Sequence, residues 1–364
     1  MTLTKPLRII GFPGRYIQGP GALGQLGKLL DEMGVTRPVV VSDEVVHQAL
    51  RPRLPDTLAN GTHLHRLAFG GECTRKAIAD LSAQASAQSA DGVVAMGGGK
   101  TIDTAKGVAR ALGCRLIIVP TVASNDSPTS RLIVIYDESH LLVGVDYLVR
   151  NPDAVLVDTE VIVQAPVRFF RAGMGDAISK RYEAAQCAQA GGLNFFGGMP
   201  PDTAGVLADR CHAVISELGQ QALSDVQAQR VSPAVESIIE ATVLLSGLGF
   251  ESGGLSLSHA LLRGLSALPE LAGALHGEQV AFGTLVQLVL EQRPQAEIAQ
   301  HRQLLKRLGL PTCLADLGLT TVTQAQVEQV ATLTMAAPYI GNFQTPLSAL
   351  SIAEAIWVAQ AMKD

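Results

Sequence analysis

A glycine turn in the first half of the chain has the residue types that bind anions. Val93 to Met96 is an apolar run that predicts a buried strand, and Gly97-Gly98-Gly99-Lys100 follows it directly. Glycines lack a Cβ, so main-chain N–H groups can approach a ligand closely. Apolar residues from Ile102 to Leu112 then recur at helical spacing, and a helix N-terminus favours negative charge. The turn predicts a phosphate or pyrophosphate site, although an ordinary tight turn explains the same glycines.

Two histidines and an aspartate in the second half have the types that ligate a metal. His259 and His276 lie near predicted helix starts, and two imidazoles with one carboxylate, such as Asp176, suit catalytic zinc with an open position. On a helix, Asp176 shares a face with Lys180, and His259 shares one with Arg263. Caps or hydrogen-bonded polar groups are the alternative role, because no H-E-x-x-H signature is present.

Polar residues also follow two other predicted strands. Asp43 ends one strand, where a carboxylate can bond both ribose hydroxyls of an adenosine and so favour NAD over NADP; an N-cap is the alternative. The loop from Pro120 to Ser130 offers hydroxyl groups and the Asp126 carboxylate beside the same predicted cofactor site. A plain turn explains that loop equally well.

The first 160 residues alternate β-branched runs with helical patterns, which predicts a parallel sheet covered on both faces. Ligands collect beyond the carboxyl ends of such strands, so Asp43, Gly97–Gly99 and Thr121 could face one crevice. The predicted strands are Val39–Asp43, Leu64–Phe69, Val93–Met96, Leu116–Val119, Leu132–Tyr136 and Val155–Asp158, and the helices between them include Glu44–Leu50 and Lys76–Gln88.

Beyond residue 160 the strand pattern stops. The predicted domains are therefore an α/β domain over residues 1–160 and an all-α domain over residues 161–364, with a loop from Asn194 to Asp202. The predicted helices are 168–190, 202–229, 232–248, 255–268, 276–292, 296–308, 323–335 and 346–362.

Composition limits the class of protein. The chain has 364 residues, 47% of them hydrophobic and 17% charged, which indicates a compact protein large enough for two domains. A net charge of −5 without a basic cluster argues against nucleic acid or an anionic membrane as the partner. Met1–Pro6 lacks an apolar signal core. The cysteines are odd in number, scattered and without a C-x-x-C, which predicts reduced thiols in the cytoplasm: Cys73, Cys114, Cys187, Cys211 and Cys313.

Taken together, long blocks of the chain resemble the glycerol dehydrogenase branch of the iron-containing alcohol dehydrogenase family. The blocks occur in the right order, and the residues 188–230 and roughly the last 70 match weakly. They are Pro13–Gly19, Gly97–Lys106, Pro120–Tyr136, Asn151–Glu160, Ala172–Ala184, Ser246–Leu255 and His276–Ala281.

The resemblance implies a Rossmann-like N-terminal domain with a helical C-terminal domain, an architecture like that of dehydroquinate synthase, and usually a homo-oligomer. It implies zinc, with iron as the alternative, on Asp176, His259 and His276, and a substrate hydroxyl contact from Asp126. Zinc would lower the pKa of the alcohol, whose hydride passes to NAD. The implied NAD-binding residues are Asp43, Gly97, Gly98, Gly99, Lys100, Asp103, Thr121, Ser124, Ser130, Leu132 and Tyr136.

At three positions the sequence has a cationic residue where the glycerol dehydrogenase branch usually has another residue type: Arg131, Lys180 and Arg263. They are predicted to lie near the metal or the cofactor, where they would favour an anionic substrate; solvent or a local acid is the alternative partner. Two hypotheses follow: a polyol dehydrogenase that converts glycerol to dihydroxyacetone, and the same chemistry on a hydroxycarboxylate or phosphorylated polyol. A non-catalytic NAD-binding protein would need a broken metal site, whereas all three ligand residues are present. A lyase reaction is compatible with the architecture alone.

Overall fold

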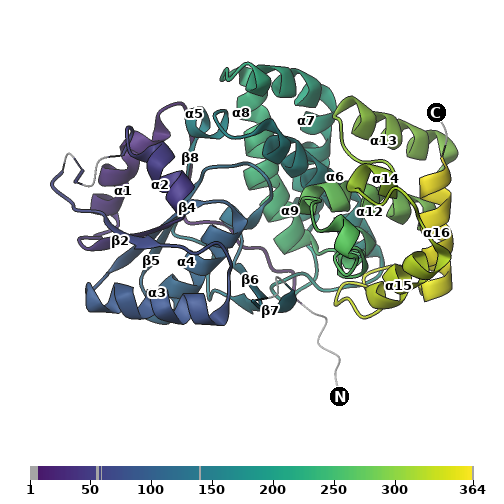
Figure 1. Ribbon diagram of the computed structural model, residues 1–364, viewed down its shortest axis with the longest axis horizontal. Helices are drawn as coiled ribbons and strands as arrows, with labels where there is room; N and C mark the ends of the chain where they lie inside the picture. The colour runs from purple at the N-terminus through teal and green to yellow at the C-terminus, as the bar shows by residue number, and fades with distance from the viewer. Residues whose placement is uncertain (1–6, 55–56, 59, 139–140, 363–364) are drawn as a thin grey trace. The chain divides into compact units, whose positions relative to one another are not determined.

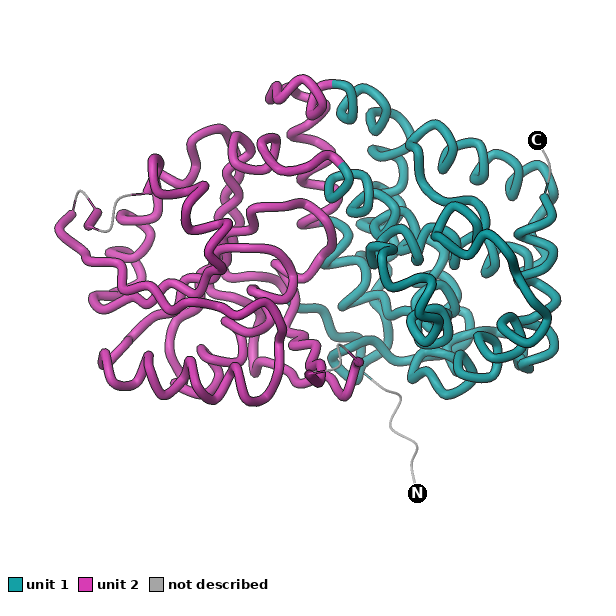
Figure 2. Tube along the Cα trace, in the orientation of Figure 1, with its two compact units in different colours: residues 1–11, 168–224, 245–364 teal, residues 12–167, 225–244 magenta. Residues whose placement is uncertain are grey.

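The protein is described from a computed structural model that covers residues 7–54, 57–58, 60–138 and 141–362. Met1–Pro6, the segment expected to lack a signal core, lies outside the described residues. The chain forms two compact units (Figure 2). The α/β unit comprises Phe12–Val167 and Asp225–Leu244, and the helical unit comprises the described residues up to Gly11, Arg168–Ser224 and the residues from Leu245 on.

The α/β unit is built on a parallel six-stranded sheet, as predicted (Figure 1). Its strands, in spatial order, are β1 (Tyr16–Gly19), β8 (Ala154–Asp158), β5 (Arg115–Pro120), β4 (Gly92–Gly97), β2 (Pro38–Ser42) and β3 (His65–Ala68). The residues of β2, β4 and β8 are buried throughout, which explains their nearly continuous apolar sequence. The chain leaves β2 toward β3 and returns on its other side as β4, so the strand order reverses beside β2.

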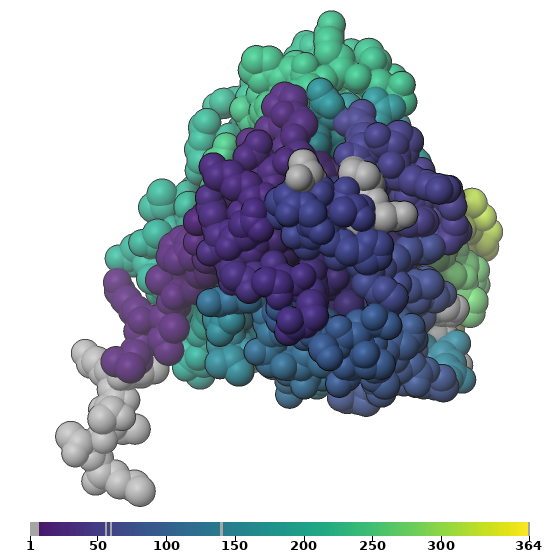
Figure 3. Space-filling model, turned by 90° about the vertical axis from the view of Figure 1, so that its left-hand side faces the viewer, coloured from purple at the N-terminus to yellow at the C-terminus, as the bar shows by residue number. Residues whose placement is uncertain are grey.

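Helices connect these strands and cover the sheet. They are α1 (Leu26–Glu32), α2 (Glu44–Leu50), α3 (Arg75–Ala87), α4 (Gly99–Leu112) and the short α5 (Thr159–Ile162). Leu26, Leu29 and Leu30 of α1 pack on sheet residues such as Val94 and Ile117 to form one core. Residues from the first part of the chain, coloured purple to blue, cover most of the face seen in Figure 3.

One predicted strand lies outside the parallel sheet. β6 (Leu132–Tyr136) pairs antiparallel with β7 (Leu142–Tyr147) in a separate two-stranded sheet. β7 is not among the predicted strands, because it is largely exposed and lacks a strong apolar pattern. β1 is not among them either, because Tyr16 and Gln18 interrupt the apolar pattern of this four-residue strand.

The second half of the chain is helical, which confirms the predicted fold class. Its helices are α6 (Val167–Gln189), α7 (Asp202–Gln227), α8 (Pro233–Ile239), α9 (Ser246–Gly253), α10 (Leu257–Ala260), α11 (Leu262–Leu265), α12 (His276–Leu290), α13 (Gln295–Arg307), α14 (Leu314–Leu317), α15 (Gln324–Thr334) and α16 (Ala349–Ala361).

Two predicted helices are divided in the structure. The helix expected over 232–248 passes from α8 through a wider π turn at Glu240–Leu245 into α9. The helix expected over 255–268 is two short helices, α10 and α11. The α10 turn begins where the N–H groups of Ser256 and Ser258 bond to the side chains of Glu183 and Gln287. Such long-range partners leave no periodic signal in the sequence.

Each compact unit combines separate segments of the chain, whereas each predicted domain is one continuous segment. Asp225–Leu244 was predicted within the helical domain, but this segment packs with the α/β unit. There Gln18 Nε2 bonds to the Glu236 carboxylate at 2.6 Å, and Thr159 Oγ1 donates to the same carboxylate at 2.7 Å. The run Pro233–Gly253 is long and apolar enough to span a membrane, and 61% of it is buried inside the protein, as expected of a core helix.

A buried histidine makes the helical unit sensitive to acid. His301 of α13 is 3% exposed, and among the described residues neither ring nitrogen has a hydrogen-bond partner. Burial, with a smaller effect of His212, lowers the pKa of His301 to about 3. The unfolded chain therefore takes up a proton below about pH 6.5 while the folded chain does not, and stability falls as pH falls from 6.5 toward 3.

Replacing this side chain should remove that dependence. We expect the free energy of unfolding of His301→Leu, relative to the unmodified protein, to rise by about 1.4 kcal/mol for each pH unit below 6.5. Urea unfolding at pH 7, 5.5 and 4.5 measures the difference. Parallel pH curves for His301→Leu and the unmodified protein would contradict the prediction.

Candidate metal centre and nucleotide-binding turn

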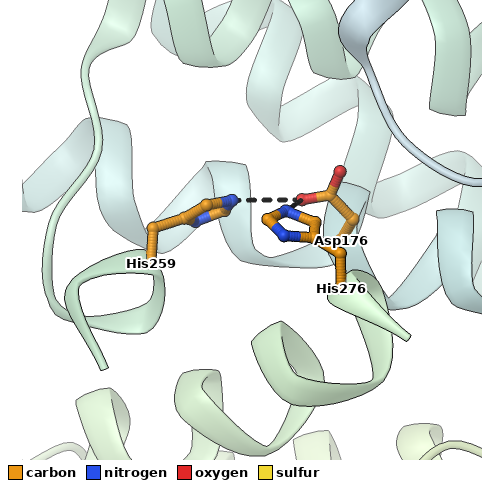
Figure 4. A group of neighbouring side chains, drawn as sticks. All are labelled: Asp176, His259 and His276. Atoms are coloured by element: carbon orange, nitrogen blue, oxygen red, sulfur yellow. Dashed lines mark ion pairs between the residues drawn. The ribbon is translucent and has the colours of Figure 1, made fainter. Parts of the chain in front are cut away.

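Three side chains of the helical unit converge on one point. Asp176 lies in α6, His259 in α10 and His276 at the first position of α12. Both imidazole rings point toward the Asp176 carboxylate (Figure 4). Asp176 Oδ1 lies 3.2 Å from His259 Nε2 and 3.6 Å from His276 Nε2. Metal bonds of about 2.0–2.1 Å in tetrahedral geometry separate neighbouring ligand atoms by about 3.4 Å, so these two distances are compatible with a small divalent cation.

Two glycines allow the backbones of α6 and α12 to meet at this point. A Cβ at Gly277 would overlap the carbonyl oxygen of Ala172, and a Cβ at Gly175 would overlap the carbonyl oxygen of Gly277. Asp176 follows Gly175 and His276 precedes Gly277, so the same close approach brings the two side chains together. The Arg168 guanidinium also holds the start of α12, because it donates to both oxygens of Glu278 at 2.8 and 2.7 Å.

Glu183 orients His259, a contact that the sequence analysis missed. Glu183 Oε2 lies 2.6 Å from His259 Nδ1, and Oε1 accepts the main-chain N–H groups of Ser256 and His259 at 3.0 Å each. Because a carboxylate accepts, Nδ1 carries a proton, which leaves Nε2, 3.2 Å from Asp176 Oδ1, as the ring nitrogen that could bind a metal. Glu183 is seven residues after Asp176, two helical turns along α6, and this spacing is the signal that could have identified it.

Neighbouring positive charges keep the buried carboxylates of Asp176 and Glu183 ionised. Burial alone would raise the pKa of Asp176, but the Lys180 ammonium and the two histidines hold it well below its usual range. Burial likewise opposes ionisation of Glu183, and His259 keeps its pKa below the ordinary value. Burial would lower the pKa of His259, but the Glu183 and Asp176 carboxylates outweigh burial and Lys180 and raise it to about 9. His259 is therefore protonated on Nε2 as well at neutral pH, and in the absence of a metal the Lys180 and His259 charges compensate those of the two carboxylates.

The three donor atoms fit a divalent cation. Asp176 Oδ2 is buried, and within the described part of the chain it has no hydrogen-bond partner, whereas Oδ1 is the oxygen that faces both imidazole rings. The half-exposed ring of His276 keeps one side of the cluster accessible. Lys180 is the other cation in the cluster: its Nζ lies 2.5 Å from Asp176 Oδ1 and 3.1 Å from His259 Nε2. As predicted, Lys180 and Asp176 share a face of α6.

The glycine turn of the α/β unit has the geometry of an anion site. β4 ends at Gly97, Gly98 is the N-cap in an extended conformation, and α4 begins at Gly99. The first helical bond runs from Ile102 N to Gly98 O at 3.0 Å, so the preceding N–H groups face outward from the helix start. A Cβ at Gly99 would lie 2.7 Å from Asn125 Nδ2, so the polar loop and the turn are in close contact.

Residues expected to contact the cofactor lie at one edge of the sheet. Asp43, Gly97 and Thr121 follow or end β2, β4 and β5, which are neighbours, beside the reversal of strand order. Ligands bind at such a point in open α/β sheets. Thr121 N donates to Gly97 O at 3.1 Å, and Asp43 caps α2 by accepting from Val46 N at 2.8 Å. The cap that was the alternative for Asp43 is therefore present, and the ribose contact stays a prediction.

Lys100 and Tyr136 are close to each other beside the turn. Lys100 Nζ bonds to Glu72 Oε2 at 2.6 Å and lies 5.4 Å from the centre of the Tyr136 ring. Burial raises the pKa of Tyr136 to about 12, so the hydroxyl stays protonated and can donate a hydrogen bond. Glu72 was not among the predicted site residues.

The buried side chains of Asp103 and Lys106 bind the polar loop that runs from Pro120 to Ser130. Asp103 was predicted to bind the cofactor, but its carboxylate is buried and accepts from Ser127 Oγ at 2.7 Å and Val134 N at 3.1 Å. Lys106 is fully buried, and its ammonium donates to Asp103 Oδ1, Ser127 O and Leu132 O at 3.1, 2.8 and 2.7 Å. Asp103 thus anchors the loop instead of facing solvent, and Lys106, absent from the predicted residues, does the same.

The remaining predicted residues differ in exposure. Ser130 is buried and 3.3 Å from Lys106 Nζ, and Leu132 is buried beside it, whereas Ser124 and Asp126 are half-buried. Arg131 lies 5.8 Å from the centre of the Tyr147 ring and donates to Leu148 O at 3.4 Å.

Arg263 is exposed on α11. Arg263 is four residues after His259, across Leu261, whose backbone dihedrals are helical, and the shared face predicted for the two residues stays a prediction.

Comparison with known proteins identifies the family. The model of the iron-containing alcohol dehydrogenases matches residues 13–159. A glycerol dehydrogenase of Thermotoga maritima is 42% identical over 320 residues, which are 88% of this chain and 87% of the relative. A glycolaldehyde reductase of Halobacterium salinarum is 39% identical over 320 residues, with the same coverage.

A solved structure shows the same fold over nearly the whole chain. The crystal structure of a probable glycerol dehydrogenase from Sinorhizobium meliloti 1021 is 39% identical, covers 97% of this chain and 98% of its own, and has a TM-score of 0.91. The chain belongs to the iron-containing alcohol dehydrogenase family, in its glycerol dehydrogenase branch.

Proposed function

We propose that this protein is a metal-dependent, NAD-linked dehydrogenase of a small polyol, which interconverts glycerol and dihydroxyacetone. The convergence of Asp176, His259 and His276 carries the proposal, because it supplies a three-ligand metal site in a chain whose relatives are named glycerol dehydrogenases. When bound, the metal would supply a Lewis acid that eases deprotonation of the alcohol, and NAD would supply the hydride acceptor. Zinc and iron both suit this donor set.

The roles of the residues follow from their placement. Asp176, His259 and His276 ligate the metal, and Glu183 keeps Nε2 of His259 directed at it. Gly97–Gly99 and Lys100 receive the pyrophosphate of NAD, and Asp126 contacts a substrate hydroxyl. Asp43, Thr121, Ser124, Ser130, Leu132 and Tyr136 border the rest of the cofactor, while Asp103 and Lys106 position the loop that carries several of them.

Two broader expectations belong to the same proposal. We infer a cytoplasmic homo-oligomer whose partners are small molecules rather than nucleic acid or membrane, in keeping with the net charge of −5. Residues 1–160 form the cofactor-binding part and residues 161–364 the metal- and substrate-binding part, apart from the segment Asp225–Leu244 that packs with the former.

An anionic substrate is the second candidate, and Lys180 favours it. Its side chain is buried and 3.1 Å from Nε2 of His259, so a cationic group borders the proposed reaction centre. A carboxylate on the substrate would interact favourably with that charge. Arg131 and Arg263 would be further contacts for such a group.

A substrate panel with metal-analysed enzyme and NAD tests the proposal. Glycerol should give the highest kcat/KM among glycerol, lactate and glycerol 1-phosphate. A preference for lactate or the phosphate would replace glycerol by the anionic class. Arg263→Ala tests the exposed arginine in that case, because a fall in kcat/KM for the acid alone would assign it to the substrate carboxylate. Absence of turnover on every alcohol at full metal loading would contradict the dehydrogenase function.

A further inference from the structure

Lys180 occupies the atoms that a metal needs. Its side chain is 0% exposed, and the Asp176 side chain beside it is 1% exposed. Lys180 is four residues after Asp176 on α6, so the helix itself brings the ammonium to the carboxylate. The 2.5 Å contact to Asp176 Oδ1 and the 3.1 Å contact to His259 Nε2 involve two of the three donor atoms of the proposed metal site.

The contact with His259 blocks a ligand atom. Nδ1 of this ring is held by the Glu183 carboxylate at 2.6 Å, so Nε2 is the only ring nitrogen that can bind a metal. Lys180 Nζ lies 3.1 Å from Nε2, so a metal ion bonded to Nε2 would meet the ammonium unless Lys180 moves away. Asp176 Oδ1 has a second lone pair, but there the ammonium charge would face a divalent cation over a few ångströms in a buried site, where such repulsion is strong.

The charges around the proposed metal site also oppose simultaneous binding of a metal and the Lys180 ammonium. Asp176 and Glu183 bring two buried negative charges to the cluster, which a divalent cation would neutralise. In this chain the Lys180 ammonium already compensates part of that charge. A metal together with Lys180 on Asp176 would leave an excess of positive charge in a site with little solvent, which is costly.

We infer that Lys180 is an internal competitor for the metal: its ammonium holds Asp176 Oδ1 and blocks access to His259 Nε2 while no metal is bound, and it must move away from both before a divalent cation is ligated. Lys180 therefore sets the metal affinity of this protein below that of an otherwise identical site with a neutral residue. The inference rests on the metal site of the proposed function, but it concerns binding and not turnover.

Zinc titration of the metal-stripped full-length chain tests it. The unmodified protein is compared with Lys180→Met, which keeps length without charge, and Lys180→Arg, which keeps the charge. Calorimetry with Zn²⁺ alone should show roughly 10- to 100-fold tighter binding to Lys180→Met, the gain expected when a competing charged hydrogen bond is removed. Lys180→Arg should stay within a few-fold of the unmodified protein. Equal affinity of the unmodified protein and Lys180→Met would overturn the inference and leave the metal site intact.

A second measurement needs no variant, so it holds if Lys180→Met fails to fold. In a crystal structure of the unmodified protein grown with Zn²⁺, we expect the Lys180 Nζ to Asp176 Oδ1 distance to exceed hydrogen-bonding range. Zinc on all three ligands with Lys180 still at both atoms would overturn the inference. Failure of zinc to bind any of the three proteins would overturn both the inference and the proposed metal site.

Discussion

His276→Ala should lower kcat/KM for glycerol by at least about 1,000-fold, because loss of one of three ligands removes the Lewis acid from the reaction. The remaining donors, Asp176 and His259, already contact Lys180, so we expect them to retain little zinc. The His276 side chain is 45% exposed, so the free energy of unfolding should change by less than about 1 kcal/mol. Steady-state kinetics, metal analysis and urea unfolding measure the three quantities.

The same variant should bind NAD normally. The turn proposed to receive the cofactor, Gly97–Lys100, belongs to the α/β unit, whereas His276 belongs to the helical unit. We therefore expect the Kd for NAD to change by less than about twofold, a difference smaller than one hydrogen bond. His63→Ala is the control, because this exposed histidine lies in the other unit and should change neither kcat/KM nor zinc content. Normal kcat of His276→Ala without bound metal would refute the metal-dependent mechanism.

Gly277→Ala should destabilise the helical unit by more than about 3 kcal/mol and abolish zinc binding. The new methyl group would overlap the carbonyl oxygen of Ala172. Both groups are fixed to the backbone of a helix, so no rotation of a side chain can relieve the overlap. α12 must then move from α6, which costs more than the 1–3 kcal/mol typical of overpacking in a core. Because Asp176 and His276 flank this crossing, the same shift separates two of the three ligands.

Urea unfolding and zinc calorimetry of Gly277→Ala measure both effects. Gly273→Ala is the matched control from the loop just before α12, because none of the described residues lies within 4 Å of a Cβ at Gly273. It should change the free energy of unfolding by less than about 1 kcal/mol and leave zinc binding intact. If Gly277→Ala folds as stably as Gly273→Ala and binds zinc equally well, the close approach of the two helices does not define the site.

Local patterns determined much of this fold. The apolar runs at Val39–Val41, Val93–Met96 and Ile117–Val119 predicted strands that are buried on both faces, and such strands carry their signal in consecutive residues. Long helices such as α6 and α7 were predicted for the same reason, since their apolar residues recur at a period that survives over many turns. Weak strands, β1 and β7, and the start of α10 were missed because exposure and long-range bonds leave no such period.

Part of the candidate site could be predicted from the sequence. The residue types of Asp176, His259 and His276, together with the family resemblance of the segments around them, are sufficient to predict a candidate metal site. Glu183 and Lys106 were missed because they act through contacts with residues distant in sequence, at His259 and at the loop around Ser127. The cofactor contact of Asp103 stays a prediction, and the buried bonds that make Asp103 an anchor of the loop leave no signal in the sequence.

By itself, then, the sequence determined an α/β sheet followed by helices, a glycine turn suited to an anion, and three residues able to ligate a metal. The tertiary structure decided that Gly175 and Gly277 bring the ligands together, that Glu183 directs His259, and that Lys180 contacts two of the ligand atoms. The physical reason is that periodicity and residue type report local preferences, whereas burial and distance depend on which distant segments pack together. A lysine one turn from Asp176 is visible in the sequence; that its ammonium also reaches His259 depends on how α10 packs on α6.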